Sequence, residues 1–226
     1  MHFSSAMPCK DIKEVQSLGI VSNAHILLCL RGGVLADLSK SEILQNYSKE
    51  IRRKDRQQGD PSFLKDLLND SVSCTIAIER DGYPLNHVAF FTYDETNHEI
   101  IFHFSKHGFA GEEITDGKKA CVSVYKYGKL YTAKRAVDFG CEYQSVVIYG
   151  TVRILIDQDE RMKAMALFFD RFFKPVAPEH YDAFTDQDAK SIYVARIKIH
   201  DWFGKEHRVP PFAIDSFYPP QNAIIK

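Results

Sequence analysis

The fold and the candidate site of this chain are both decided by one segment, Ile100-Ile101-Phe102-His103-Phe104-Ser105-Lys106-His107-Gly108. Its first half is β-branched and aromatic, which is typical of a strand that packs against other strands. Its second half places a histidine, a hydroxyl, a cation and a glycine where that strand ends. Ile101, His103 and Ser105 share one face, because side chains alternate along a strand. The segment therefore predicts a strand that carries polar side chains to an anion-binding edge.

Strand-like runs flank this segment. Val72–Ile78 alternates apolar and polar residues, and the Asp81-Gly82 pair that follows is typical of a tight hairpin turn. A long strand is predicted over residues 84–93, and a turn over 94–98 leads into the strand 99–104. Further strands are predicted over residues 120–125, 143–156 and 191–199. Two successive hairpins favour an antiparallel meander that closes into a barrel over a parallel sheet.

Helices are expected around the barrel. Asp60 can cap a helix that has Pro61 in its first position, and the apolar residues of that helix fall on one face, namely Phe63, Leu64, Leu67 and Leu68. The clearest helix covers 157–173, and its apolar stripe is predicted to pack on the barrel through Met162, Met165, Ala166, Phe169 and Phe172. A short helix with an acidic first turn is predicted over 111–117.

Two further features concern the strands near the C-terminal half. The polar segment 127–141 is expected to be a hairpin or a loop. Gly150 interrupts an apolar strand, which predicts a β-bulge or a close approach of another backbone.

Size and composition exclude several functions. The 226 residues suffice for one large or two small domains, and the net charge of −1 gives no basic field for nucleic acid. The apolar run 24–30 is too short to span a membrane and lacks a signal-peptide cleavage site. The five cysteines have no metal-ligand spacing. We expect a cytoplasmic protein that has no metal site and binds neither nucleic acid nor membranes.

The chain divides into three parts by pattern. Residues 1–49 are predicted to be an extension packed on the barrel, with a strand or short helix over 26–30 and a helix over 39–47. Residues 50–203 are the predicted barrel domain. Residues 204–226 form a proline-rich tail, expected to be extended on the surface or to reach a partner.

The polar residues allow two interpretations each. The cluster Arg52-Arg53-Lys54-Asp55-Arg56 is either a solvated surface patch or a cationic arm that reaches a phosphate. His103 is either structural or part of a site. The hydroxyl, cation and backbone N–H groups of residues 105–111 suit a phosphate, although Glu112 and Glu113 would repel one. No Gly-x-Ser-x-Gly, HExxH or P-loop motif is present.

Four of these motifs occur in an order that resembles a known family. The order is the 52–56 cluster, Pro84-Leu85-Asn86, residues 102–108, and Tyr143-Gln144-Ser145-Val146-Val147-Ile148-Tyr149-Gly150. It resembles the pyridoxamine 5′-phosphate oxidase-related flavoproteins, and within them the nitroimidazole-resistance-type branch, over residues 50–203. The resemblance implies a mainly β fold, a split β-barrel with peripheral helices. It also implies a homodimer that binds FMN in clefts at the subunit interface.

The resemblance also implies roles for individual residues. His103 is expected at the flavin and is the candidate catalytic residue, with Ser105 and Lys106 near the FMN phosphate. Tyr143 and Ser145 are expected to donate hydrogen bonds to the flavin ring or ribityl chain. The predicted cofactor-binding set is completed by Arg53 and Asn86. The family often has a lysine where this chain has Ala110, so Lys106 or Lys118 would have to compensate at the phosphate.

Three functions remain open from the sequence. The first is an FMN-dependent oxidoreductase that acts on a small planar substrate, nitroaromatic or quinone-like. The second is a flavin- or haem-binding module without turnover, in which His103 or His107 would be the axial ligand. The third is an interaction protein with a degenerate site, which Ala110 suggests.

Overall fold

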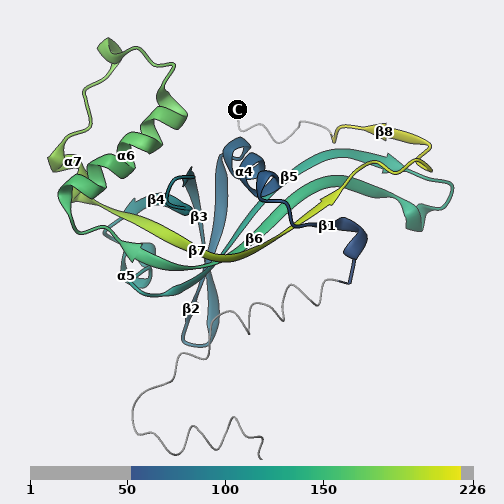
Figure 1. Cartoon of the computed structure of the whole chain (residues 1–226), viewed down its shortest axis with the longest axis horizontal. Helices are drawn as coiled ribbons and strands as arrows, with labels where there is room; N and C mark the ends of the chain where they lie inside the picture. The colour runs from purple at the N-terminus through teal and green to yellow at the C-terminus, as the bar shows by residue number, and fades with distance from the viewer. Residues whose placement is uncertain (1–51, 220–226) are drawn as a thin grey trace, which may run out of the picture. The chain divides into compact units, whose positions relative to one another are not determined.

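The computed structural model of the protein describes residues 52–219 (Figure 1), all of which belong to one compact unit. The extension predicted over 1–49, with its elements at 26–30 and 39–47, lies outside the described residues. The domain boundary predicted at 203/204 stays a prediction, although the last long strand of the barrel runs across it.

Within residues 52–219, the strands form one antiparallel sheet that closes on itself. The order is β1-β7-β4-β3-β2-β5-β6; β6 also pairs with β7, and β8 pairs with β5. The strands are β1 Gln57–Gln58, β2 Ser73–Arg80, β3 Tyr83–Asp94, β4 Glu99–Ser105, β5 Lys119–Thr132, β6 Gly140–Ile154, β7 Ile192–His207 and β8 Asp215–Phe217. The β6–β7 pairing closes the ring, which confirms the predicted split β-barrel class.

Helices lie around the barrel. They are η1 Lys54–Arg56, α4 Pro61–Asp70, α5 Phe109–Glu113, η2 Ala136–Asp138, α6 Gln158–Phe173, η3 Pro178–His180 and α7 Asp186–Ser191. α4 starts as predicted, because the Asp60 side chain accepts a hydrogen bond from the Ser62 N–H and Pro61 occupies the first turn.

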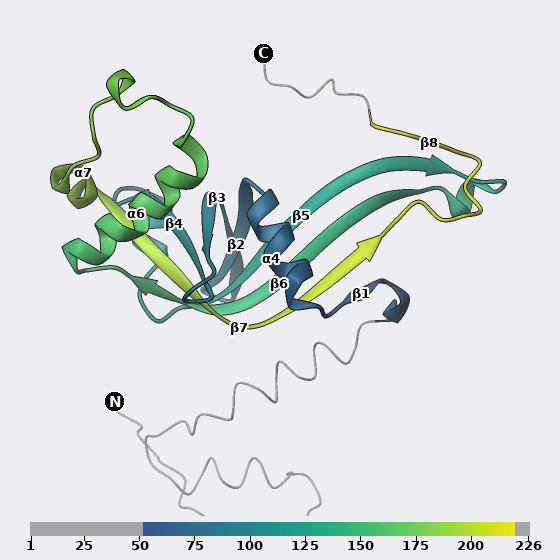
Figure 2. The ribbon, with the colours of Figure 1, turned by 45° about the horizontal axis from the view of Figure 1, so that its top comes forward.

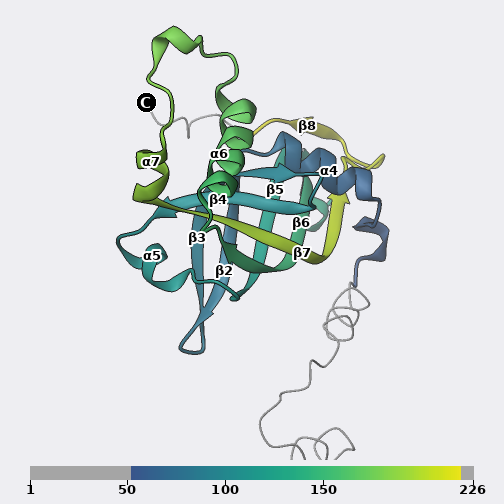
Figure 3. The ribbon, with the colours of Figure 1, turned by 60° about the vertical axis from the view of Figure 1, so that its left-hand side comes forward.

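The barrel core and the packing of α6 occupy opposite faces of β4. Phe102 and Phe104 point into the core with Ile76 and Val122, whereas Ile101 points outward against α6. We call the face away from the core the outer face. The predicted alternation along β4 is thus confirmed. Figure 3 shows α6 in front of β4 and β7 on this outer side.

β5, β6 and the end of β7 continue beyond the barrel as a long ribbon, which β8 joins (Figure 2). We call residues 125–145 and 204–217 the arm. Of the two alternatives predicted for residues 127–141, the hairpin is confirmed. Leu130 and Tyr131 pair with Cys141 and Gly140, after a register shift that follows Tyr127. β7 likewise continues to residue 207, because its polar end has β6 as a hydrogen-bonding partner.

Two helix predictions need correction, and one helix was not predicted. α5 begins at Phe109, ahead of the predicted 111–117, after Gly108 with φ 85°, a backbone conformation that suits glycine. The buried face of α6 is Ala164, Met165 and Phe168, so Met162 and Ala166 are not its core residues. α7 was not predicted. Its signal is the capping box of Thr185 and Asp188.

The prediction for Gly150 is confirmed. The β6–β7 register shifts between Tyr149 and Gly150, and a side chain at Gly150 would collide with the Lys198 carbonyl and with Ile197. The close approach of the two backbones therefore requires glycine here.

Arg171 connects α6 to the barrel. Its guanidinium donates to the carbonyl of Phe91 on β3 at 2.9 Å and to three carbonyls at the end of α4, those of Leu68, Asn69 and Ser71. The last turn of a helix leaves its carbonyls without helical partners, and here one cation serves several of them.

We expect Arg171→Met to lower the free energy of unfolding by about 2–3 kcal/mol, because it leaves half-buried carbonyls without a charged donor. The measurement is urea denaturation followed by circular dichroism. Lys174→Met, which removes an exposed cation near the end of the same helix, is the control and should change little. Equal losses in the two variants would contradict the anchoring role.

Candidate functional site

β3 and β4 pair only over residues 91–94 of β3 and 99–102 of β4. The pairing of these strands ends at Phe91 and Phe102. β3 nevertheless stays paired with β2 back to Tyr83, and β4 stays paired with β7 as far as Ser105. Residues 83–90 of β3 are thus separated from the end of β4. We call this opening the split; Figure 3 shows the β2–β3 hairpin extending away from β4, on the side of α5.

The split holds a pocket of about 450 Å³. Its walls are mostly apolar or aromatic, with one guanidinium, one carboxylate and one side-chain amide; the lining residues are Arg80, Asp81, Tyr83, Pro84, Leu85, Asn86 and Phe109. A second pocket of about 400 Å³ shares Tyr83 and Pro84 with it and continues over Ala77 and Cys121 to Tyr149. The two pockets together suit a flat, largely apolar ligand with a few polar groups.

His103 lies on β4 directly after the last residue that pairs with β3. Its ring meets Phe168 of α6 edge to face, with centroids 4.9 Å apart. Its Nδ1 is buried and has no hydrogen-bond partner among the described residues. Burial lowers the pKa of His103 below its ordinary value of 6.5, so the ring is neutral at pH 7. A buried nitrogen without a partner is costly unless a ligand or water pairs with it.

Ser105 and Lys106 follow on the same side of the split. The Ser105 hydroxyl accepts a hydrogen bond from the His107 N–H at 3.1 Å. The Lys106 ammonium donates to the carbonyl of Lys190 at the end of α7, and it lies 5.4 Å from the centroid of the Tyr193 ring. The cation predicted for a phosphate is therefore engaged elsewhere. Asn86 lies on the opposite side of the split, on β3.

The remaining predicted residues lie in or beside the arm. Tyr143 and Ser145 are on β6, where they pair with Tyr127 and Tyr125 of β5. The exposed Arg53 forms a two-pronged ion pair with Asp55, with a shortest distance of 2.6 Å. Strand geometry sets Tyr143 on the order of 20 Å from the row of paired residues that contains Asn86. A single protomer thus does not bring the seven predicted residues together.

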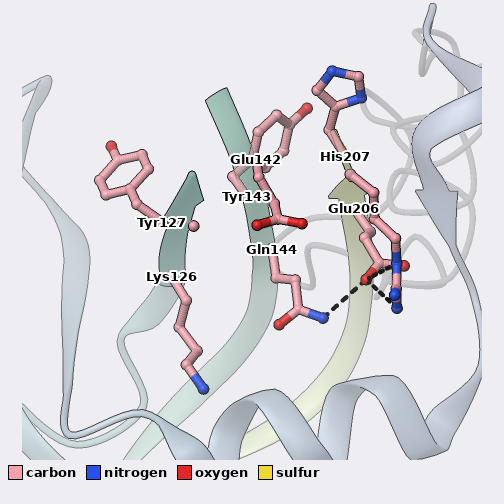
Figure 4. Close-up of a pocket in the computed structure, with 9 residues that line it drawn as sticks. Lys126, Tyr127, Glu142, Tyr143, Gln144, Glu206 and His207 are labelled. Atoms are coloured by element: carbon pink, nitrogen blue, oxygen red, sulfur yellow. Dashed lines mark hydrogen bonds and ion pairs between the residues drawn. The ribbon is translucent and has the colours of Figure 1, made fainter. Parts of the chain in front are cut away.

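The arm contains a pocket of its own, of about 250 Å³ (Figure 4), lined by Lys126, Tyr127, Gly128, Glu142, Tyr143, Gln144, Glu206, His207 and Arg208. The Glu206 carboxylate accepts hydrogen bonds from Gln144 and Arg208. His207 Nε2 lies 2.8 Å from the Tyr131 hydroxyl. Sequence reasoning missed His207, because a tail was predicted at that position.

Burial, helped by two nearby guanidinium groups, keeps the His207 ring neutral. Burial lowers its pKa most, and the positive charges of Arg56 and Arg53 lower it further. Arg56 also approaches the Tyr143 hydroxyl to 3.4 Å. The arm pocket therefore combines a neutral imidazole, tyrosine hydroxyls and a guanidinium.

Sequence reasoning also missed Arg80 and Phe109. The Arg80 guanidinium lies 4.9 Å from the centroid of the Phe109 ring, in the pocket of the split. Arg80 lies beside a hairpin turn, where a charged residue is common and indicates no function. Phe109 is the first residue of α5. Only the fold brings them together.

Within residues 52–219, no three histidine, cysteine, aspartate or glutamate side chains gather as metal ligands. In the same range, no helix has the length and apolar character needed to cross a membrane.

We expect the His103 ring to titrate with a pKa below 6.5, and Phe168→Ala to move that pKa back toward 6.5, because water then reaches the imidazole. The measurement is an NMR titration in which His103→Gln assigns the resonance. Leu167→Ala, at an exposed position of the same helix, is the control. An ordinary pKa in the unaltered protein would contradict the burial of this ring.

Solved structures share this fold. The flavocytochrome Anf3 from Azotobacter vinelandii matches with a TM-score of 0.63 and 20% identity, over 73% of this chain and 74% of that one. An FAD- and heme-binding protein from Mycobacterium smegmatis matches with a TM-score of 0.61 and 25% identity, over 69% and 75%. A putative 5-nitroimidazole antibiotic resistance protein from Bacteroides thetaiotaomicron gives a TM-score of 0.55 and 16% identity, over 66% and 86%. No curated protein matches the sequence.

The sequence itself carries the family assignment. The family model described as pyridoxamine 5′-phosphate oxidase matches residues 61–206, more than half of the chain, from the start of α4 to the end of β7. This protein therefore belongs to the pyridoxamine 5′-phosphate oxidase family of flavin-binding proteins.

Proposed function

We propose that the protein binds FMN in the split and acts as an oxidoreductase on a small planar substrate, nitroaromatic or quinone-like. The observation that carries the proposal is the split itself. Two largely apolar pockets, of about 450 and 400 Å³, share Tyr83 and Pro84 on its β3 side. The half-buried His103 marks its inner end, directly after the last β4 residue that pairs with β3. Family membership supports flavin as the ligand, and FMN is the form that the sequence resemblance implies.

The residues present fit a flavin. A flat ring needs apolar walls, which Tyr83, Pro84 and Tyr149 offer over the two pockets. Its polar edge needs a few hydrogen-bonding groups, and among the lining residues Asn86 provides a side-chain amide. His103 lines neither pocket, and its unpartnered Nδ1 lies at the inner end of the split, where β3 and β4 separate. The flavin, when bound, supplies the electron-transfer chemistry, while the protein orients it and excludes solvent.

His103 is the proposed catalytic residue. Because its ring is neutral, one nitrogen can donate a hydrogen bond and the other can accept one. Phe168 covers one edge of the ring, and Arg171 fixes α6 to the barrel, so this side of the site excludes water. A neutral imidazole in a dry position can hold or deliver a proton as the substrate is reduced.

We also propose a homodimer. The outer face carries a row of neighbouring residues across five strands: Val88, Thr75, Ser123, Val147 and Phe203. Several large apolar residues next to or within this row are more than half exposed, among them Val88, Phe90, Tyr125 and Tyr127. A contiguous apolar surface of this kind is typical of an interface. A second copy on this face would bring Tyr143 and Ser145 of its arm toward the split.

Haem binding without turnover is the second candidate. It is favoured by the structure at 25% identity, which is named an FAD- and heme-binding protein. His103 or His107 would be the axial ligand. A Soret band that forms with added haem and disappears in His103→Ala or His107→Ala would favour this role over flavin turnover.

The proposal predicts that added FMN raises the melting temperature and that its fluorescence changes on binding, because a ligand of the native state stabilises it. The bound flavin should be reduced by a chemical donor and reoxidised by a quinone or nitroaromatic. His103→Ala should slow this reoxidation about tenfold to a thousandfold while FMN still binds.

The oligomeric state is measured on the same sample by light scattering, where a dimer is expected. Val88→Arg on the exposed outer face should yield monomers that bind FMN more weakly. An unchanged melting temperature and unchanged flavin fluorescence would refute FMN binding, and a monomer would refute the shared site.

A further inference from the structure

We infer that Arg80, supported by Lys118, holds the phosphate of the flavin in place of the cations after β4. The inference rests on the proposed function, because it assigns a phosphate contact to the same site. The sequence pointed to Lys106 or Lys118 as the substitute for the missing lysine at the phosphate, and it did not point to Arg80.

The geometry of Arg80 carries the inference. Arg80 ends β2 and lines the pocket of about 450 Å³ together with Asn86, on the opposite strand of the hairpin. Its guanidinium lies 4.9 Å from the centroid of the Phe109 ring at the start of α5. An aromatic face holds a guanidinium in a fixed plane and leaves its N–H edge free to donate to phosphate oxygens.

The segment after β4 does not offer a comparable cation to a phosphate. The Lys106 ammonium donates to the Lys190 carbonyl and lies near the Tyr193 ring. The position where the family often has a lysine is Ala110, on α5. The first turn of α5 therefore offers an aromatic ring and a methyl group, and the cation over that ring comes from β2.

Glu113 gives Arg80 and Lys118 a common partner. Its carboxylate lies 3.2 Å from Arg80 Nε and 3.6 Å from Lys118 Nζ, and its side chain is only 17% exposed. Two cations that share one carboxylate have unused capacity for a second anion. Asp81 also lies 3.5 Å from Arg80, but at 88% exposure its charge is largely screened by solvent.

The charges of these four side chains cancel, which limits the size of the effect. Arg80 and Lys118 carry two positive charges, and Glu113 and Asp81 carry two negative ones. A phosphate must compete with Glu113 for the same cations. The structure therefore predicts a modest preference for FMN over riboflavin, which has the same ring and no phosphate, and it predicts that Glu113 reduces this preference.

The test compares the dissociation constants of FMN and riboflavin for the full-length protein, measured by flavin fluorescence titration. Arg80→Met keeps the apolar stem and should lower the FMN-to-riboflavin preference about tenfold, as expected for one charged hydrogen bond. Glu113→Gln should raise the preference, because it frees both cations. Riboflavin binding should change little in either variant, and Lys106→Met is the control that should leave the preference unchanged.

The outcomes separate the two proposals. If the unaltered protein binds both flavins equally, or if Lys106→Met and not Arg80→Met removes the preference, the assignment of Arg80 is wrong while flavin binding stands. If the unaltered protein binds neither flavin, both proposals fail. Glu113→Gln leaves Arg80 itself unaltered, so this variant tests the inference even if Arg80→Met folds poorly. An unchanged FMN-to-riboflavin preference in Glu113→Gln would overturn the role of the shared carboxylate and its cations.

Discussion

The end of the β3–β4 pairing at Phe91 and Phe102 is the constraint on which the site depends. β4 remains bound to β7, and β3 remains bound to β2, so the two strands diverge without either losing its other neighbour. Elsewhere the ring of strands is closed, including at β6 and β7, where Gly150 lets the backbones approach. The backbone groups along the split still require hydrogen-bond partners, and this is where a ligand can supply them.

The helices determine which side of the split is dry. Arg171 fixes α6 against β3 and the end of α4, and Phe168 then covers the ring of His103. The low pKa of this histidine follows from that cover and not from a neighbouring charge, since burial is its sole cause. On the other side of the split, α5 leaves a pocket open beside Asn86 and Phe109. One end of the site is thus enclosed and the other remains accessible.

Local patterns predicted the parts of the fold that local interactions determine. Alternation placed His103 and Ser105 on one face of β4, and the Asp-Gly turn and the Asp60-Pro61 start are where they were predicted. For the arm, the sequence predicted a hairpin or a loop over 127–141, and the hairpin is confirmed. The end of β7 was missed because it is polar and becomes a regular strand only through long-range pairing with β6. Only part of the site was predicted, because some of its residues come together only through long-range contacts. His103 belongs to a recognisable sequence motif. Arg80 becomes a candidate binding residue only in the folded structure, where α5 brings Phe109 next to its guanidinium.

The distribution of charge indicates how this site would bind a cofactor. Arg53 is paired with Asp55, Lys106 is bound to a carbonyl of α7, and Arg80 shares Glu113 with Lys118. None of these cations stands without a partner in the described structure, in keeping with a net charge of only −1 for the whole chain. An anionic group must therefore displace an existing partner to form an ion pair, so the net gain in binding free energy from that ion pair is small. Most of the binding free energy must then come from burying the flat ring between apolar walls, since that burial displaces no partner.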